Sequence, residues 1–332
     1  MTPYGQTAAI FGCEGATLGR AEASFFAESQ PFGFILFARN VETPKQLKQL
    51  TTSLRDCVGR DVPIFVDQEG GRVQRLRAPH WREWPAPLDF VQSAGPNAAR
   101  AMALRYRLIA RELLDVGITG NCAPTADVII PTTHPFLRNR CYSSDPKMVA
   151  EISLAVARGL MAEGVWPVVK HLPGHGRSEN DTHHDLPKVT AEAETLQDSD
   201  FVPFKALAEL PFAMTAHIVF SAFDSRPATQ SPTMIRIIRE EIGFKGLLLT
   251  DDLNMKALTG TLYDRTALSM AAGCDLALHC NGDLAEMQSV AKAAGSLRSD
   301  SLCKATKALS MAPTGDQLDT DALDAELKSL LI

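Results

Sequence analysis

The side chains that could carry acid–base chemistry are concentrated in one segment, residues 168–187. Two valines precede Lys170 and His171, so we expect a buried strand that ends on two polar side chains. The sequence PGHG at 173–176 then interrupts regular structure, because proline and glycine disfavour the interiors of helices and strands. The ionisable residues that follow include Asp181, His183, His184 and Asp185. So many ionisable groups in one short segment predict an active-site segment rather than an ordinary surface loop.

Asp181 and His183 could form an acid–base pair. Their spacing of two residues places both on the same side of an extended segment. A carboxylate hydrogen-bonded to an imidazole fixes its tautomer and stabilises its protonated form, as a general acid and base requires. A solvated polar loop would explain the two residues taken alone. The nearby glycines favour the catalytic interpretation, because they would let the segment swing over a site.

Lys170, His171 and His175 allow more than one chemistry. Lys170 could form a Schiff base, as in an aldolase, or act as a fixed cation that donates hydrogen bonds to a hydroxylated ligand. His171 beside it favours the second role. The i, i+4 spacing of His171 and His175 suits a metal site only on a helix, and the intervening Pro173 and Gly174 exclude one. We therefore expect no metal.

Charged side chains also follow apolar runs elsewhere in the chain. Asp67 comes directly after such a run, and Arg75 follows it across a pair of glycines. A carboxylate and a guanidinium together suit the hydroxyls of a sugar, and a structural Asp–Arg pair is an equally good interpretation. Arg140 could complete a polar ring around the same site.

Asp251 and Asp252 follow the apolar run at 246–250. Successive side chains of a strand alternate in direction, so only one of the two carboxylates can face a site while the strand continues. We assign Asp251 to the site and Asp252 to capping or orienting the turn that follows. An interpretation in which both residues are caps would be about as good without further context.

Short apolar runs alternate with amphipathic stretches along the whole chain, which predicts repeated βα units. Expected strands lie at 8–12, 33–37, 63–66, 120–123, 165–169, 212–216, 246–250 and 275–279. Expected helices lie at 18–28, 44–57, 97–116, 146–163, 200–207, 232–242 and 265–272, with one more after residue 283. Eight such units predict an α/β protein with a single (β/α)8 TIM-type barrel over residues 1–332, with a doubly wound open sheet as the alternative. The active site of such a barrel lies at the carboxyl ends of its strands, where the polar residues above are expected.

Composition argues against several classes of protein. A formal net charge of −6 disfavours a partner such as duplex nucleic acid, which selects a basic face. The N-terminus has no early positive charge followed by an apolar core, so we expect no secretory signal. No apolar run approaches roughly 20 residues, so we expect no membrane span, and we expect no membrane partner. The seven cysteines are scattered without a CxxC pair, which fits reduced thiols in a cytoplasm. The expected partner is therefore a small-molecule substrate.

Several of these segments together resemble the bacterial β-N-acetylglucosaminidases of glycoside hydrolase family 3. The sequence KHLPGHG at 170–176, followed by DTH at 181–183, is similar to the family signature, KH-x-PGHG and then D-[ST]-H. The similarity extends to GFILFARN at 33–40, DQEGGRVQR at 67–75 and TDDLNM at 250–255. These motifs occur in the family's order and cover the chain from about the second expected strand to the eighth.

The resemblance implies a one-domain (β/α)8 enzyme that releases terminal, non-reducing β-linked GlcNAc. Its usual substrate would be a cytoplasmic muropeptide, GlcNAc-1,6-anhydroMurNAc with or without peptide, during cell-wall recycling. Asp251 matches the family's nucleophile and His183 its acid/base, with Asp181 as the partner of the histidine. The positions that match GlcNAc-binding residues are Asp67, Arg75, Arg140, Lys170 and His171. No metal or organic cofactor is implied, and we expect a monomer.

Two features qualify the resemblance. The sequence LRNRCY at 137–142 differs from the family's more usual IG-x-R-[SA]-F around Arg140. The chain also ends soon after the expected barrel, which favours the short cytoplasmic type over a secreted enzyme with a second domain.

The implied mechanism is retaining, through a covalent glycosyl-aspartate, with water or phosphate as the acceptor. A sugar-binding module without catalysis would need neither Asp251 nor the pair of Asp181 and His183.

Overall fold

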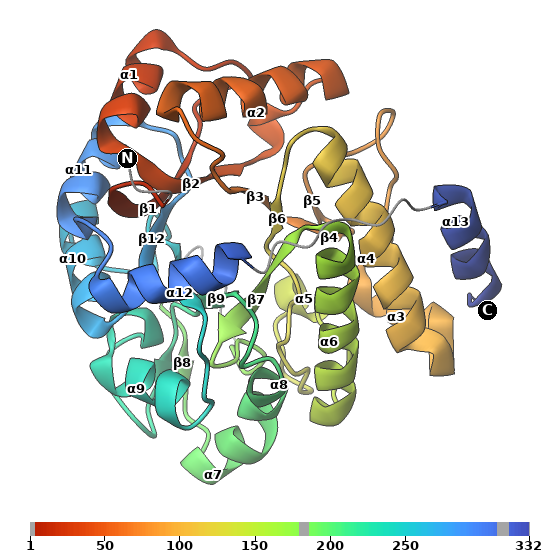
Figure 1. Cartoon of the computed structure of the whole chain (residues 1–332). Coiled ribbons are helices and arrows are strands. Elements are labelled where there is room, and N and C mark those ends of the chain that lie inside the picture. Colours follow the sequence, from red (N-terminus) through yellow and green to blue (C-terminus); the bar gives the residue numbers. More distant parts are fainter. Residues whose placement is uncertain (1–3, 179–185, 311–318, 332) are drawn as a thin grey trace.

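The computed structural model describes residues 4–178, 186–310 and 319–331. Its centre is a closed barrel of parallel strands in the order β1-β2-β3-β6-β7-β9-β11-β12, with β12 paired to β1. Helices surround this barrel (Figure 1). The strands are β1 Thr7–Gly12, β2 Pro31–Leu36, β3 Ile64–Val66, β6 Gly120–Asn121, β7 Trp166–Leu172, β9 Phe212–Thr215, β11 Leu247–Asp252 and β12 Leu276–His279. The predicted single (β/α)8 barrel is confirmed, and the alternative of an open sheet is wrong.

The helices begin and end at local signals in the sequence. Helix α6 begins after Asp145, whose carboxylate accepts a hydrogen bond of 2.9 Å from the backbone N–H of Lys147, and ends at Gly164 with φ of 100°. Helix α9 begins after Ser231, whose hydroxyl accepts from the backbone N–H of Met234 at 3.0 Å. The predicted helices correspond to α1 Arg20–Ser29, α2 Pro44–Val58, α4 Ala98–Asp115, α6 Pro146–Glu163, α8 Phe201–Ala206, α9 Pro232–Glu240, α10 Leu262–Ala272 and α11 Leu284–Ala294.

Most elements that the prediction missed lie outside the repeated units. The long connection after β3 contains a small hairpin, β4 Gln68–Gly70 with β5 Val73–Gln74, and helix α3 Pro87–Ala94. Two short strands, β8 Lys188–Val189 and β10 Val219–Phe220, pair beside the barrel. The chain after α11, which is the expected C-terminal helix, forms two further helices that were not predicted, α12 Ser299–Ser310 and α13 Thr320–Ser329. These segments lack the repeating pattern of apolar runs from which the barrel was predicted.

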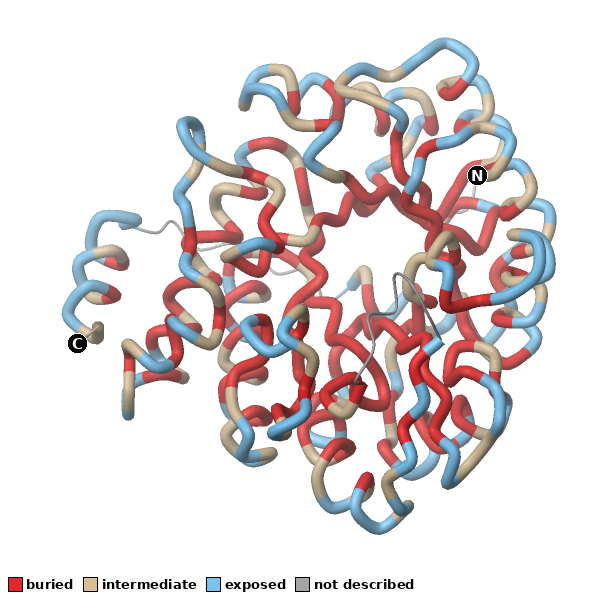
Figure 2. Tube along the Cα trace, turned by 180° about the vertical axis from the view of Figure 1, so that it is seen from behind, coloured by how far each residue is buried: buried red, intermediate tan, exposed pale blue. Residues whose placement is uncertain are grey.

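The barrel interior is filled with apolar side chains and is covered at one end. Phe65 and Phe212 meet edge to face across the interior, with ring centroids 5.5 Å apart. Helix α12 lies across the amino ends of the strands (Figure 1), and its Ala305 and Ala308 belong to the same buried cluster as the barrel interior. Seen from the opposite side, the buried strands form a central ring within exposed loops and helices (Figure 2). A ligand can therefore approach the barrel axis from the carboxyl ends of the strands.

Asp275 attaches α12 to the barrel. Its fully buried carboxylate accepts hydrogen bonds from Ser301 at 2.6 Å and Lys304 at 2.9 Å on α12, and from Arg239 at 2.5 Å on α9. Replacing Asp275 by alanine would leave these donors without their buried partner. We expect the free energy of unfolding, measured by urea denaturation, to fall by about 3–5 kcal/mol.

Asp300 on the same helix provides the matched control. It also pairs with Lys304, at 2.9 Å, but its side chain is 57% exposed. An exposed ion pair contributes little, so Asp300→Ala should cost less than about 1 kcal/mol. Equal and small losses for the two variants would show that Asp275 does not hold α12 in place.

Candidate active site

Six of the eight predicted site residues line one pocket at the carboxyl end of the barrel. This pocket has a volume of about 250 Å³, and its polar lining includes Asp67, Arg75, Arg140, Lys170, His171 and Asp251. Its apolar lining includes Ile35, Phe37, Phe136, Met214 and Leu278. The two remaining predicted residues, Asp181 and His183, lie outside the described residues. Sequence reasoning thus named residues from separate parts of the chain that the fold brings together.

An irregularity in β7 turns two consecutive side chains into the pocket. Between Val169 and Leu172, β7 has one more residue than the segment of β9 with which it pairs. Such an extra residue breaks the alternation of side chains along a strand. Lys170 and His171 lie within this irregularity and both line the pocket. The strand was expected to end on these two side chains, and β7 includes both and continues to Leu172.

The same irregularity occurs at the two aspartates. Between Leu249 and Asp252, β11 has one more residue than the facing segment of β12. Asp251 and Asp252 therefore both line the pocket. The expectation that only one of them could face the site is wrong, because it assumed regular alternation along the strand.

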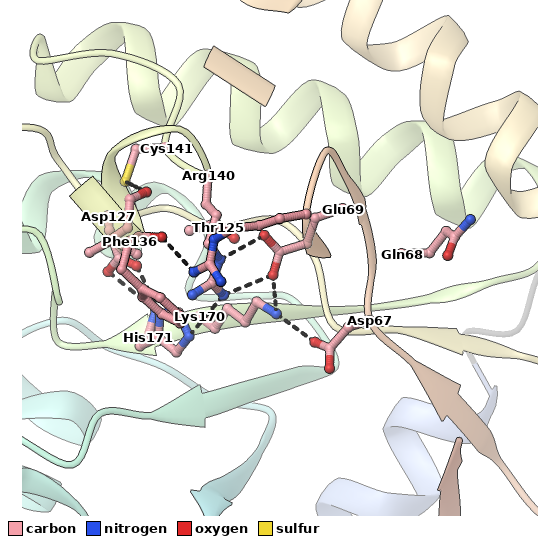
Figure 3. A network of polar contacts seen from close by, with 12 residues as sticks. Asp67, Gln68, Glu69, Thr125, Asp127, Phe136, Arg140, Cys141, Lys170 and His171 are labelled. Carbon is pink, nitrogen blue, oxygen red and sulfur yellow. Dashed lines mark hydrogen bonds and ion pairs between the residues drawn. The ribbon is translucent and has the colours of Figure 1, made fainter. Parts of the chain in front are cut away.

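In the pocket, the ammonium of Lys170 lies between the carboxylates of Asp67 and Glu69 (Figure 3). Its ammonium lies 2.8 Å from Asp67 and 2.5 Å from Glu69. Arg75, from the connection after β5, donates to the other oxygen of Asp67 at 3.1 Å. Lys170 and Glu69 are almost completely buried, whereas the Asp67 side chain is 15% exposed toward the pocket.

Arg140 is fixed by the same buried glutamate. It donates two hydrogen bonds to Glu69, from Nε at 3.0 Å and from Nη2 at 2.8 Å (Figure 3). This two-point geometry fixes the plane of the guanidinium as well as its position. Arg140 therefore lies in the pocket despite the unusual sequence that surrounds it, and Glu69 orients both of the deepest cations.

The pKa shifts of Asp67, Glu69 and Lys170 keep all three side chains charged. Burial raises the pKa of Asp67, but Lys170 and Arg75 outweigh it and leave that pKa well below its usual range. Burial likewise opposes ionisation of Glu69, yet Arg140 and Lys170 lower its pKa to about 2. Burial disfavours the ammonium form of Lys170, but Asp67 and Glu69 together raise its pKa above the ordinary value.

The protonation of Lys170 decides between its two possible functions. A Schiff base requires a neutral amine as the nucleophile. Two carboxylates within 2.8 Å of the ammonium, and the raised pKa that they cause, keep that amine protonated. This arrangement counts against an aldolase and favours a fixed cation that donates hydrogen bonds to a ligand.

Asp251 is placed as an ionised carboxylate beside the network. Burial raises its pKa, but the neighbouring His217 and His171 and the backbone N–H of Asp252 together lower that pKa below its usual value. The N–H of Asp252 donates to Asp251 Oδ1 at 2.8 Å. His217, after β9, contacts the carbonyl oxygen of Asp252 through Nε2 at 3.0 Å and Thr229 through Nδ1 at 2.8 Å. This fixed carboxylate has the form that a nucleophile needs.

Asp252 orients the turn, as the sequence suggested. Its Oδ1 accepts hydrogen bonds from the backbone N–H groups of Asn254 at 3.1 Å and Cys280 at 3.3 Å. It thereby joins the end of β11 to the end of β12. Burial and the adjacent Asp251 raise the pKa of Asp252 to about 6.

Asp127 was missed by sequence reasoning although it contacts a predicted site residue. It lies in the connection after β6, is fully buried, and its Oδ2 lies 2.8 Å from Nδ1 of His171. A lone acidic residue within the largely apolar run 122–130 was a usable signal, because buried acids are rare without a partner. Glu69 was missed too, and its spacing of two from Asp67 would have indicated the same side of an extended segment.

Comparison with known proteins agrees with the family suggested by the motifs. The chain matches the model of the glycosyl hydrolase family 3 N-terminal domain over residues 15–307. A β-hexosaminidase from Alkalilimnicola ehrlichii is 37% identical over 280 residues, which cover 82% of this chain and 80% of that protein. One from Pseudomonas aeruginosa is 36% identical over 253 residues, or 75% of each chain.

Solved structures are similar over nearly the whole chain. NagZ from Neisseria gonorrhoeae in complex with N-trifluoroacetyl-D-glucosamine superimposes with a TM-score of 0.88 at 27% identity, covering 100% of this chain and 99% of that one. A family 3 β-N-acetylglucosaminidase from Paenibacillus gives a TM-score of 0.86 at 25% identity, covering 97% of this chain and 66% of that one.

Proposed function

Because this chain belongs to glycosyl hydrolase family 3 and is a β-N-acetylhexosaminidase, we propose that it is a retaining exo-β-N-acetylglucosaminidase of cell-wall recycling. The observation that carries this proposal is the pocket in which Asp251 and the network of Lys170, Asp67 and Arg140 converge. The pocket ends on the packed barrel interior, so it suits the terminal sugar of a chain rather than an internal one.

In the proposed reaction Asp251 attacks the anomeric carbon of the bound GlcNAc. His183 protonates the oxygen of the departing group as the glycosidic bond breaks, and a covalent glycosyl-aspartate forms. His183 then removes a proton from water, which attacks the same carbon and releases Asp251, so the product retains the β configuration. Asp181 would stabilise the imidazolium of His183 in the first step. The described contacts of Asp251 support its role as nucleophile, and the roles of Asp181 and His183 rest on the family motif.

The GlcNAc is proposed to bind through Asp67, Arg75, Arg140, Lys170 and His171. Their carboxylate, cationic and imidazole groups can both accept hydrogen bonds from sugar hydroxyls and donate to them. The ion pairs within the network hold these side chains in place before the sugar arrives, which reduces the conformational entropy lost on binding.

We further propose muropeptides as the substrates, specifically GlcNAc-1,6-anhydroMurNAc with or without peptide, and a cytoplasmic, single-domain monomer as the enzyme. These points rest on the motifs shared with the bacterial enzymes. Within the described ranges of the chain, no helix is long and apolar enough to cross a lipid bilayer.

Hydrolysis of three aryl glycosides, β-GlcNAc, β-GalNAc and β-glucose, tests the proposal. We expect rapid release of the aryl group from β-GlcNAc and slow release from β-glucose, which lacks the 2-acetamido group. Incubation with GlcNAc-1,6-anhydroMurNAc should then liberate free GlcNAc. Equal rates with β-GlcNAc and β-glucose, or an intact muropeptide after complete turnover of the aryl β-GlcNAc, would contradict the proposed substrate.

A further inference from the structure

We propose that Asp127 is a positioning residue that holds His171 with its proton on Nδ1, so that Nε2 accepts a hydrogen bond from the bound sugar. The identity of that sugar rests on the proposed function. The state of the His171 ring rests only on contacts within the protein, and it can be measured without any substrate.

Asp127 meets His171 and the following segment through both carboxylate oxygens. Its Oδ2 lies 2.8 Å from His171 Nδ1 (Figure 3). Its Oδ1 accepts from the backbone N–H groups of His171 at 3.3 Å and His175 at 2.7 Å. Burial raises the pKa of Asp127, but His171, His175 and these hydrogen bonds outweigh it and leave that pKa below its usual value. An ionised carboxylate only accepts hydrogen bonds, so the proton of this contact belongs to Nδ1.

The other ring nitrogen of His171 faces a cation. Nη2 of Arg140 lies 3.5 Å from His171 Nε2, and the guanidinium is held there by its two hydrogen bonds to Glu69. A guanidinium only donates hydrogen bonds, so a proton on Nε2 would point at another donor. Both neighbours of the ring therefore select the same tautomer, with Nδ1 protonated and Nε2 bearing a lone pair.

Within the described residues, the other ionisable neighbours of His171 make no hydrogen bond to its ring. His175 packs edge-on against His171, with centroids 5.2 Å apart, and burial lowers the pKa of His175 to about 4. His175 is therefore neutral near pH 7. Lys170 points to Asp67 and Glu69, and Asp251 accepts a hydrogen bond from the backbone N–H of Asp252.

An acceptor at Nε2 would complement the donors around it. Lys170, Arg75 and Arg140 can only donate to sugar hydroxyls, and the carboxylate oxygens of Glu69 already accept from Lys170 and Arg140. A sugar hydroxyl that accepts a hydrogen bond from one of these cations still needs an acceptor for its own O–H. A buried donor without a partner destabilises the bound state, and the Nε2 lone pair would give the hydroxyl proton a partner.

The variant Asp127→Asn tests this assignment, because it keeps the shape and reverses the hydrogen bonding. Its amide oxygen must face the backbone N–H groups of His171 and His175, which leaves the NH₂ group facing Nδ1. His171 should then move its proton to Nε2, as the equivalent substitution does in the serine protease triad. Nitrogen NMR of histidine-labelled protein, above the ordinary imidazole pKa of about 6.5, distinguishes the two tautomers. The signal of His171 is assigned by its loss in His171→Gln.

We expect the Nδ1–H tautomer in the unmodified protein and the Nε2–H tautomer in Asp127→Asn. With aryl β-GlcNAc, kcat/KM should fall roughly 10–100-fold in this variant, mainly through a higher KM, because one hydrogen bond to the sugar is lost. Thr133→Val is the matched control. Thr133 is buried and donates to the carbonyl oxygen of Gly176 at 2.6 Å, so its loss disturbs the same segment without contacting the ring. It should leave the tautomer unchanged.

An Nε2–H or doubly protonated His171 in the unmodified protein would overturn the proposal, even if Asp127→Asn does not fold. An unchanged tautomer in a folded Asp127→Asn variant would overturn it as well. If the unmodified chain hydrolyses no aryl β-GlcNAc, the proposed function fails, and the NMR measurement still decides the role of Asp127.

Discussion

Replacing Asp251 by alanine is expected to abolish turnover of aryl β-GlcNAc, with a loss of kcat on the order of 10⁴–10⁶-fold. The variant would lack the carboxylate that attacks the anomeric carbon, and neither leaving-group activation nor sugar binding can replace a covalent nucleophile. Steady-state kinetics with an activated aryl glycoside measure the effect. The good leaving group matters, because it makes formation of the glycosyl-enzyme depend on the nucleophile alone.

Two controls separate this result from a folding defect. Thermal unfolding of Asp251→Ala should resemble that of the unmodified protein, since the Asp251 side chain accepts only one described hydrogen bond, from the adjacent N–H. Added azide should restore part of the turnover by entering the vacated space, and it should give the α-glycosyl azide by direct attack. Near-normal activity in Asp251→Ala would remove Asp251 from the role of nucleophile.

Replacing His183 by alanine should slow poor leaving groups far more than good ones. Alkyl or sugar leaving groups require a proton as the bond breaks, whereas a nitrophenolate departs without one. General acid catalysis contributes roughly 10²–10⁴-fold, so kcat/KM for a poor leaving group should fall by that factor. Comparing aryl glycosides whose phenols span a range of pKa values gives the dependence directly.

Asp181→Asn is the matched variant for this prediction. It retains the imidazole of His183 but removes the charge that would stabilise its protonated form, so its effect should follow the same dependence on leaving group at smaller size. An equal loss for good and poor leaving groups in His183→Ala would exclude His183 as the general acid.

The barrel was predictable because its physical signal repeats along the chain. Each strand is a short apolar run, and several helices carry their own N-terminal signal, such as Asp145 before α6 or Ser231 before α9. Helix α12 was not predicted, since its position depends on tertiary contacts of Asp275 with Ser301 and Lys304 rather than on periodicity.

The site was predictable in its residues and less so in its geometry. Asp67, Lys170 and Asp251 follow or end apolar runs, so the barrel model placed them at one end before the structure was known. That Lys170 and His171 both reach the pocket depends on an extra residue in β7, which sequence alternation cannot reveal. The roles of Glu69 and Asp127 depend on partners 71 and 44 residues away along the chain, and no local pattern specifies such pairs.

Trapping of the covalent intermediate tests the central claim most directly. A fluorinated β-GlcNAc analogue with a good leaving group slows breakdown of the glycosyl-enzyme, because fluorine destabilises the positive charge of the transition state. Mass spectrometry of the intact protein should show one added sugar, and peptide mapping should locate that sugar on Asp251. A sugar attached to Asp252 or to any other residue, or rapid turnover with inversion and no adduct, would contradict the account.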